Sequence, residues 1–340
     1  MNMQEAIRRV TEGGDLDAAE MTAVMRTIMT GEATPSQIGG FLVGLRMKGE
    51  TVAEIAAAAA VMRELAQRVE VADEDLLDTC GTGGDASGTV NVSTAAAFVA
   101  AAGGAVVAKH GNRSVSSKSG SADVLEQAGA RLDLSPVEVG HCIERVGVGF
   151  LFAPQHHSAM KHAIGPRREM GVRTLFNLLG PLTNPAGAHR QLLGVFSDPW
   201  VVPLAEVLRE LGSRRVMVVH GADGLDEISV SAPTRVAELA DGEIREYTVD
   251  AAALGLREHP SSALKVGGAD ESLARIREAF SGGVTPSADL IAANAGAALY
   301  VAGKAPSLRE GVEMARELMG SGAAAGRLDA FVEATREGDR

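Results

Sequence analysis

Beyond about residue 75, short apolar segments rich in Val and Leu alternate with segments of helical character. Four apolar segments have the length and composition of buried strands: AVVAKHG at 105–111, VGFLFAP at 148–154, LLGVF at 192–196 and RRVMVVHG at 214–221. Helices are predicted between them, at 93–104, 122–129, 135–147 and 199–212. Strands that alternate with helices are typical of α/β domains, because parallel neighbours need a long crossover connection. We therefore predict a mostly parallel central sheet.

The first 70 or so residues are predicted to be helical and to contain no strand. Three capping boxes mark helix starts, each with an N-cap side chain and a third helical residue that bond one another's amides: Asp17 with Glu20, Thr34 with Gln37, and Thr51 with Glu54. Pro35 stands at a first helical position, where its missing N–H costs nothing. The sequence thus predicts three or four helices in a small helical domain over residues 1–72.

A second helical stretch, residues 156–185, interrupts the alternation between two predicted strands. We expect its helices, around 160–188, to return to the N-terminal ones and complete the helical domain. Residues 73–340 would form the larger α/β domain. Within it, residues 234–249 read as a hairpin around Asp241-Gly242, and the tail from Asp270 is again helical.

Charge and composition exclude several classes of function. The net charge is −12 and only 3% of the 340 residues are aromatic, which disfavours nucleic acids and anionic membranes as partners. No apolar run approaches the ~18 residues that a membrane span needs, and the N-terminus lacks a signal-peptide core. The two cysteines, Cys80 and Cys142, have no CxxC spacing. We therefore expect a reduced, cytoplasmic setting.

A glycine-rich segment, DTCGTGGDASGTVNVST at 78–94, follows an apolar pair and precedes an Ala-rich helix. Glycines let a ligand approach the backbone, and the amides at a helix start suit phosphate. The segment is not a P-loop, because no Lys follows its glycines, and it is not GxGxxG, because residue 86 is Ala86. A helix dipole contributes only ~0.5–1 kcal/mol, so an anion here needs added cations. Cys80 is expected to be a small buried residue before the turn.

The following predicted strand leads into a second polar loop, KHGNRSVSSKSGS at 109–121, which supplies those cations. The loop carries Lys109, Arg113 and Lys118, with four serines between Ser114 and Ser119. Loops at strand ends are where ligands bind in open α/β sheets. Two such loops on one sheet predict a phosphate or pyrophosphate ligand.

A third segment, HGADGLDEIS at 220–229, follows a predicted strand and contains two adjacent carboxylates, Asp226 and Glu227, with Asp223 nearby. Paired carboxylates beside phosphate loops predict Mg²⁺, which prefers oxygen ligands and shares them with substrate phosphates. Asp85 and Ser93 are further oxygen donors. The histidines at 110, 156, 157 and 162 have no cysteine or carboxylate at zinc spacing, so we expect packing or hydrogen bonding from them, not zinc.

The motifs GTGGD, NVST, KHGNRSVSSKSGSADVLE, RTLFNLLGPLTNP and GLDE occur in this order, and together they resemble the anthranilate phosphoribosyltransferase family. The resemblance covers nearly the whole chain. It implies a nucleoside phosphorylase-type fold, with a small N-terminal helical domain and a large α/β domain, paired as a homodimer through the helical part. It implies transfer of the phosphoribosyl group of phosphoribosyl pyrophosphate (PRPP) to anthranilate, with Mg²⁺, two ions per site.

The resemblance also assigns site residues. For PRPP these are Gly81, Gly84, Asp85, Thr89, Asn91, Val92, Ser93, Thr94, Lys109, His110, Gly111, Asn112, Arg113, Ser114, Val115, Ser116, Ser117 and Ser121. For anthranilate they are Gly81, His110, Asn112, His157, Arg167, Gly180 and Pro181, with Arg167 facing the carboxylate. For the metals they are Ser93, Asp226 and Glu227.

The implied chemistry needs no protein acid, base or nucleophile. Displacement at an anomeric carbon passes through an oxocarbenium-like state, so the leaving group's charge must be neutralised, with Lys109 as an electrostatic aid. Alignment of amine and carbon supplies the rest. Two alternatives stay open: a pyrimidine nucleoside phosphorylase, and a nonenzymatic nucleic-acid-binding relative of the same fold.

Overall fold

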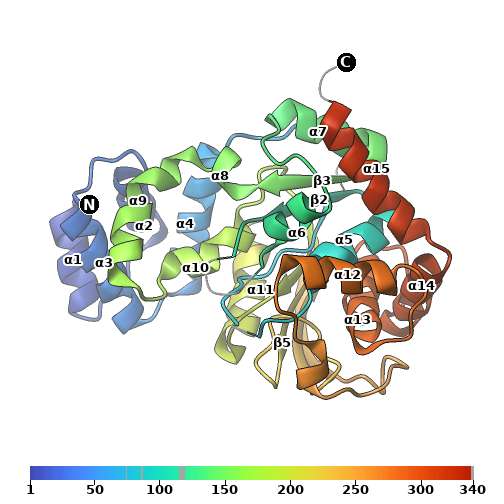
Figure 1. The fold of residues 1–340 in the computed structure, drawn as a ribbon. Coiled ribbons are helices and arrows are strands. Elements are labelled where there is room, and N and C mark those ends of the chain that lie inside the picture. Colours follow the sequence, from blue (N-terminus) through green and yellow to red (C-terminus); the bar gives the residue numbers. More distant parts are fainter. Residues whose placement is uncertain (74, 86, 115–118, 338–340) are drawn as a thin grey trace.

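A single twisted sheet of seven strands organises the chain, in the order β3-β2-β1-β4-β5-β6-β7. The computed structural model describes residues 1–73, 75–85, 87–114 and 119–337. The strands are β1 Leu77–Asp78, β2 Val107–Gly111, β3 Val148–Phe152, β4 Arg190–Gly194, β5 Arg215–Gly221, β6 Thr234–Ala240 and β7 Glu243–Val249. Figure 1 shows the sheet between a bundle of N-terminal helices on one side and the C-terminal helices on the other.

The first five strands run parallel, as predicted, and β6 and β7 continue the sheet antiparallel. The chain builds outward from β1 to β3 and then returns to the other side of β1 with β4. The strand order therefore reverses between β1 and β4. At such a switch point the loops at the carboxyl ends diverge and leave a crevice, which is where open α/β sheets bind ligands.

Except for the edge strand β7, which is mostly exposed, the strands are buried on both faces, which explains why β2 to β5 read as continuous apolar runs. On β5, Val216 and Val218 join the core shared with the N-terminal helices, whereas Met217 and Val219 join the core of the C-terminal helices. The alternation follows the two-residue period of a strand. β4 lies at 190–194 and not at the predicted 192–196, because its pairing with β1 begins at Arg190.

Helices of the α/β part cover the two faces. The core on one face contains residues of α5 (Val92–Ala102), α6 (Ser121–Gln127), α12 (Ala269–Ala279), α13 (Pro286–Val301), α14 (Leu308–Gly320) and α15 (Ala323–Glu337). α7 (Pro136–Val146) packs beside β3, and α11 (Val201–Glu210) packs on β5 and β6. Short 3-10 turns lie at Asp198–Trp200 and Ser261–Leu264. α13 is apolar nearly all round, as expected of a helix enclosed by others.

The N-terminal segment forms four helices and no strand, which confirms the prediction: α1 Met3–Thr11, α2 Ala18–Met29, α3 Pro35–Lys48 and α4 Val52–Leu65. All three predicted capping boxes are present, and Pro35 is the first residue of its helix. None of the helices among the described residues is long and apolar enough to cross a membrane.

The helical excursion contains α8 (Ala153–His156), α9 (Lys161–Met170) and α10 (Leu175–Leu179), with 3-10 turns at Ser158–Met160 and Gly180–Leu182. α9 packs on α2 and α3, and α10 packs on α3 and α4. Figure 1 shows α9 and α10 in green beside the blue N-terminal helices. Segments more than 100 residues apart in sequence therefore form one bundle, and the chain passes from α/β part to bundle and back.

The predicted hairpin is confirmed. β6 and β7 pair antiparallel, and the two residues between them, Asp241 and Gly242, have φ of 53° and 80°. Positive φ at both turn positions defines a type I′ turn, which matches the twist of the strands it joins. An Asp-Gly pair is suited to those angles.

Glu54, near the start of α4, ties the N-terminal helices together. Its side chain is fully buried and accepts hydrogen bonds from the Leu16 N–H at 2.9 Å, the Thr51 N–H at 2.8 Å and the Lys48 Nζ at 3.0 Å. One carboxylate thus satisfies amides of two helix-start segments and pairs with a lysine whose side chain is only 5% exposed.

We predict that Glu54→Ala lowers the free energy of unfolding by about 3 kcal/mol, because it leaves two buried amides and part of a buried charge without partners. Glu64→Ala on the same helix is the matched control. Glu64 is 54% exposed and, among the described residues, pairs only with Arg26, so its loss should cost no more than about 0.5 kcal/mol. Denaturant titration of both variants measures the difference. Equal losses would show that Glu54 has no special structural role.

Candidate active site

The glycine loop lies in the crevice between β1 and β4, held by contacts to the ends of neighbouring strands. The Thr82 N–H donates to the Gly194 carbonyl at 2.9 Å, and the Phe196 N–H donates to the Thr82 hydroxyl at 3.0 Å. The Gly83 N–H donates to Asp226 Oδ2 at 2.9 Å. The loop after β1 and the acidic turn after β5, separated by more than 140 residues, are therefore in direct contact.

Gly194, the last residue of β4, makes this contact possible. A Cβ at Gly194 would lie 1.5 Å from the Asp226 carbonyl oxygen, far inside any allowed separation. Any side chain there would force the acidic turn away from the glycine loop. The glycine is thus required for close backbone approach, and its φ does not lie in the left-handed region.

Lys109, on β2, is a buried cation in the centre of the site. It is 3% exposed, and its Nζ donates to the Thr79 carbonyl at 2.7 Å and to the Ser93 hydroxyl at 3.3 Å. The Ser93 N–H in turn donates to Glu227 Oε1 at 3.2 Å. The structure therefore brings together the lysine, the serine at the start of α5 and the acidic turn.

Asp226, Glu227 and Asp85 form a group of carboxylates beside Lys109. Burial and then the Asp85 charge raise the pKa of Asp226 to about 7, and burial and then the Asp226 charge raise the pKa of Glu227 well above its usual value. The residues that surround these carboxylates do not neutralise them fully. Asp223 is not part of the group, because its Oδ2 accepts from the Ser229 hydroxyl at 2.7 Å.

The donor set fits a hard cation. Its atoms are carboxylate and hydroxyl oxygens, which Mg²⁺ prefers over nitrogen and sulfur. Among the described residues no group of three or more His, Cys, Asp or Glu is arranged to hold a metal ion by itself. A Mg²⁺ ion that takes the rest of its ligands from a phosphate and from water needs only one or two carboxylates from the protein.

Asp78, at the end of β1, is a buried acid whose role the sequence did not reveal. It is fully buried, and it accepts from the His110 N–H at 3.1 Å and from the Asn184 side chain at 2.8 Å. Burial raises its pKa to about 6, with the Lys109 charge opposing the shift. An acidic residue at the end of a buried strand was the available signal for it.

His110 and His157 are buried, and their rings lie next to each other. Their ring centroids are 5.2 Å apart, and His110 Nδ1 lies 3.1 Å from the Gly180 carbonyl. Burial lowers the pKa of His110 well below its usual value and that of His157 to about 4. Gly180 and Pro181 begin the 3-10 turn that carries this carbonyl. These four predicted residues are brought together, with the imidazoles held neutral.

Both imidazoles keep a nitrogen without a partner. Nε2 of His110 and Nε2 of His157 are buried and form no hydrogen bond among the residues that the structure describes. The hydroxyl of Thr94, in the first turn of α5, is also buried and has no hydrogen-bond partner among the described residues. Unsatisfied buried polar atoms are uncommon and often mark places that a ligand completes.

Other predicted residues of the phosphate loops have structural partners. The Asn91 side chain bonds to Ser119 and Ser272, and the Thr89 hydroxyl lies 3.2 Å from the Ser87 hydroxyl. Arg113 pairs with Asp123 and Glu126 on α6 and lies over the Phe152 ring. Gly111 lies beside Ser121, since a Cβ there would be 3.3 Å from the Ser121 Cβ. Val115, Ser116 and Ser117 fall outside the described residues, as does Lys118.

Arg167 and Asn112 are not brought against the histidines by any contact among the described residues. The Arg167 guanidinium lies 5.1 Å from the Phe176 ring centroid, has no ion pair in the described part of the chain, and has a pKa lowered by burial. Asn112 is exposed, and its side chain accepts from the Arg113 N–H at 2.7 Å. Cys80 is buried, as predicted, and burial strongly raises the pKa of its thiol.

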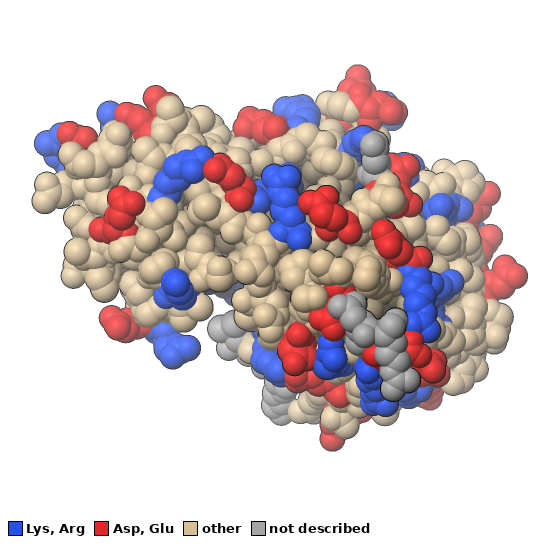
Figure 2. Space-filling view, turned by 90° about the horizontal axis from the view of Figure 1, so that it is seen from above, with Lys and Arg blue, Asp and Glu red and all other residues tan. Residues whose placement is uncertain are grey.

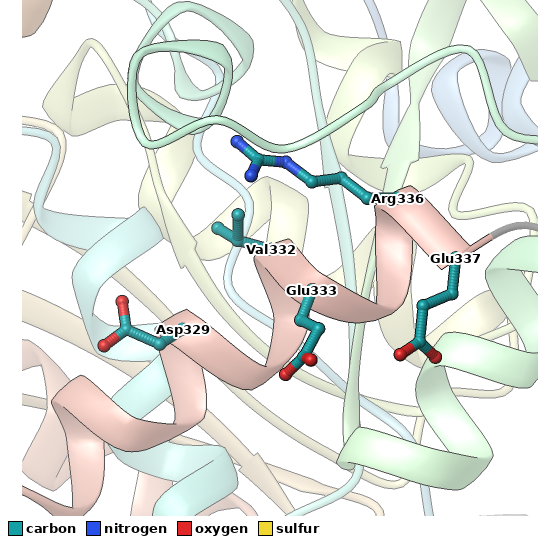
Figure 3. Close-up of a pocket in the computed structure, with 5 residues that line it drawn as sticks. All are labelled: Asp329, Val332, Glu333, Arg336 and Glu337. Carbon is teal, nitrogen blue, oxygen red and sulfur yellow. The ribbon is translucent and has the colours of Figure 1, made fainter.

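Two surface features lie apart from this site. A hollow of about 480 Å³ is lined by Asp329, Val332, Glu333, Arg336 and Glu337, all on α15 (Figure 3). Glu333 and Glu337 project to one side of the helix, whereas Asp329, Val332 and Arg336 project to the other. On the face shown in Figure 2, Lys and Arg residues lie interspersed with Asp and Glu. That face offers no continuous basic groove among its described residues.

Both parts of the chain match known family models. The model for "Glycosyl transferase family, helical bundle domain" matches residues 4–66, and the model for "Glycosyl transferase family, a/b domain" matches residues 73–325. Together they cover the N-terminal helices, the sheet and most of the helices that follow it.

Individual relatives are similar over the full length. An anthranilate phosphoribosyltransferase from Alkalilimnicola ehrlichii is 71% identical over 337 residues, which are 99% of this chain and 100% of the relative. The crystal structure of anthranilate phosphoribosyltransferase from Thermus thermophilus is 48% identical, with a TM-score of 0.92 over 97% of this chain and 99% of that one.

The enzyme from Saccharomyces cerevisiae is similar in structure at lower identity. In complex with PRPP and Mg it is 26% identical, with a TM-score of 0.89 over 98% of both chains. In complex with 4-fluoroanthranilate it is 25% identical, with a TM-score of 0.88 over 98% of both. The chain therefore belongs to this glycosyl transferase family and, within it, to the anthranilate phosphoribosyltransferases. The resemblance seen in the sequence motifs is confirmed, and so is the predicted fold class.

The neutral histidines predict how stability depends on pH. The pKa of His157 is about 4 in the folded chain, against ~6.5 when unfolded. The unfolded state therefore binds protons first as pH falls, and stability present above pH ~6.5 is lost on the way to pH ~4. Between pH 7 and 5 His157 should account for about 2 kcal/mol of lost unfolding free energy. His110 and His156, also held neutral by burial, add to the slope.

We expect His157→Asn to make this pH dependence shallower by about 2 kcal/mol between pH 7 and 5. Urea titrations at a series of pH values give the comparison. Parallel slopes for wild type and His157→Asn would rule out a neutral buried His157.

Proposed function

We propose that this protein transfers the 5-phosphoribosyl group of PRPP to the amine of anthranilate, giving N-(5-phosphoribosyl)anthranilate and pyrophosphate. The observation that carries the proposal is the cluster at the β1–β4 crevice. There a glycine loop, a buried lysine and an acidic turn converge at the strand ends. The names of the relatives supply the substrates, and the chain matches them over 97% or more of its length.

PRPP would lie along the glycine loop and the start of α5. The backbone of the glycine loop is open to a ligand, since Gly83 is exposed and its neighbours are half-buried, although the Thr82 and Gly83 amides are already bonded within the protein. Ser93, in the first turn of α5, lies where unpaired helix amides favour phosphate. The described residues that follow Val107 and Ala108 on β2, from Lys109 to Ser114, would lie on the pyrophosphate side. The yeast relative solved in complex with PRPP and Mg supports a PRPP site in this fold.

Asp226 and Glu227, with Ser93, would hold Mg²⁺, and we propose two ions per site. When bound, the metal would neutralise charge on the pyrophosphate leaving group. The protein's own part is to keep this acidic turn in place. Asn294 of α13 does so: its side chain accepts from the Ile228 N–H at 2.8 Å and donates to the Ile228 carbonyl at 2.9 Å.

Catalysis would depend on charge and alignment and not on a protein nucleophile. Lys109 is fixed by two hydrogen bonds and offers positive charge that needs no rearrangement during reaction. Cys80 is buried with a raised thiol pKa, which disfavours the thiolate. We therefore propose an oxocarbenium-like displacement without a covalent enzyme intermediate.

Anthranilate would bind near His110 and His157, whose neutral rings and unpartnered Nε2 atoms suit an aromatic amine with hydrogen-bonding groups. Arg167 would meet its carboxylate. A guanidinium that is partly buried, stacked on Phe176 and without an ion pair among the described residues is suited to a bidentate carboxylate ligand. The yeast relative in complex with 4-fluoroanthranilate supports an anthranilate site in this fold.

We further propose that the protein is a homodimer through its helical bundle. Val43 and Met47 of α3 are 37% and 83% exposed, and Ile164 and Val172, in and just after α9, are 45% and 46% exposed. α3 and α9 pack against each other, so these apolar side chains belong to one part of the surface. Exposed apolar groups of this kind favour association with a second copy.

The direct test is the transferase reaction. Purified protein with PRPP, Mg²⁺ and anthranilate should consume anthranilate, which is followed by its fluorescence, and chelation of the metal should stop the reaction. Thymidine or uridine with phosphate is the control for nucleoside phosphorylase activity, which the relatives' names do not favour. Folded protein that consumes no anthranilate, or that cleaves a nucleoside instead, would refute the proposal.

Arg167→Ala tests the anthranilate site. We expect the KM for anthranilate to rise about 10–100-fold, because a charge-assisted pair is lost, while the KM for PRPP changes less than about 3-fold. Arg168→Ala, at the adjacent exposed position, should change neither constant appreciably. Steady-state kinetics with each substrate varied in turn gives both values. Equal rises in the two KM values would remove Arg167 from the anthranilate site.

A further inference from the structure

The glycine loop is held from four sides, and one of the four contacts comes from outside the α/β part. Thr82 is bonded to Gly194 and Phe196, and Gly83 is bonded to Asp226. The next residue, Gly84, has its carbonyl bonded by the Arg173 guanidinium. Arg173 lies in the linker between α9 and α10, the two helices that pack on the N-terminal bundle.

The contact between residue 173 and Gly84 requires the planar guanidinium group of an arginine. The Arg173 guanidinium carbon is 4.2 Å from the Phe196 ring centroid, which is a cation–π arrangement. A Cβ at Gly84 would be 3.4 Å from one guanidinium nitrogen and 3.6 Å from another, so the group also lies close against the loop backbone. A planar cation can stack on a ring and donate to a carbonyl together, whereas a lysine ammonium offers only a point charge.

Arg173 is itself fixed in position. Its carbonyl accepts from Nη1 of Arg46, on α3, at 2.6 Å. The next residue, Thr174, is the N-cap of α10, and its N–H donates to the Asn177 side chain at 3.0 Å. The side chain therefore projects from a backbone held both by α3 and by a helix start. It is exposed, so the contact lies at the rim of the crevice.

The loop needs such an anchor. Gly83 and Gly84 have φ of 65° and 83°, and without side chains they have nothing of their own to pack. Adjacent glycines lose more conformational freedom on ordering than any other pair. Gly84 also lies between the amide that meets Asp226 and the carboxylate of Asp85. Fixing its carbonyl thus limits the movement of both neighbours.

We propose that Arg173 is a positioning residue, which fixes Gly84 from the helical side and so holds the glycine loop in the conformation that binds PRPP. The claim that Arg173 orders the loop depends only on the contacts described above. The claim that it affects PRPP binding rests on the proposed function. The residue touches no reacting group in this account. It acts through the loop backbone.

Amide hydrogen exchange of the substrate-free protein tests the ordering. In Arg173→Ala, peptides that contain Thr82 and Gly83 should exchange about 10-fold faster than in wild type, because the loop opens more often. Arg173→Lys should recover only part of the protection. Arg168→Ala, which removes an exposed arginine from α9, is the matched control and should exchange like wild type. Equal exchange in Arg173→Ala and Arg168→Ala would overturn the proposal.

Kinetics then tests the consequence. The KM for PRPP should rise about 10-fold in Arg173→Ala while the KM for anthranilate stays within about 3-fold. Faster exchange without a change in the KM for PRPP would also overturn the positioning role. If the wild-type protein has no transferase activity, the proposed function is contradicted. The hydrogen-exchange result then still decides whether Arg173 orders the glycine loop. Thermal unfolding of each variant distinguishes a local effect from loss of fold.

Discussion

A single buried cation, Lys109, connects the parts of the site. Its Nζ is bonded to Thr79 after β1 and to Ser93 at the start of α5, and its charge opposes the raised pKa of both Asp78 and Glu227. A buried charge is costly unless it is paired and hydrogen-bonded. Here the charges of the lysine and of the carboxylates offset part of the energy that burying each of them requires. The same arrangement leaves the carboxylates only partly neutralised, which favours a further cation.

The topology of the sheet explains why these groups meet. The strand order reverses between β1 and β4, so the loop after β1 faces the ends of β4 and β5. Two residues allow the acidic turn to lie close to the glycine loop. Gly194 has no side chain and so leaves room for the Asp226 carbonyl, and Asn294 of the enclosed helix α13 bonds the backbone of Ile228. The functional side chains are thus placed by residues that have no chemistry of their own. This is the expected division between a rigid scaffold and the strand-end loops that carry function.

The predictable part of the molecule is the part encoded locally. Capping boxes, the Asp241-Gly242 turn and the Val- and Leu-rich strands each lie within a few residues, and all were found, with β4 shifted by two residues from its predicted place. The clustering of Lys109 with the acidic turn could be predicted because both follow parallel strands, and loops at the carboxyl ends of parallel strands lie at the same edge of the sheet. The sequence could not show that Asp78 bonds to Asn184, or that Arg173 reaches Gly84, because each pair is about 90 or more residues apart. The separate packing of Arg167 on Phe176 was likewise hidden, since it depends on how α9 and α10 lie together.

The helical excursion between β3 and β4 gives the two parts of the chain a common boundary. It supplies the Gly180 carbonyl to His110 and the Arg173 guanidinium to Gly84, while its helices pack on the N-terminal bundle. The segment that completes the bundle is therefore also a wall of the site. A movement of the bundle relative to the sheet would therefore act on both the Gly180–His110 contact and the Arg173–Gly84 contact. In the proposed reaction, which depends on aligning an amine with an anomeric carbon, one displacement of this shared segment would act on both proposed substrate sites.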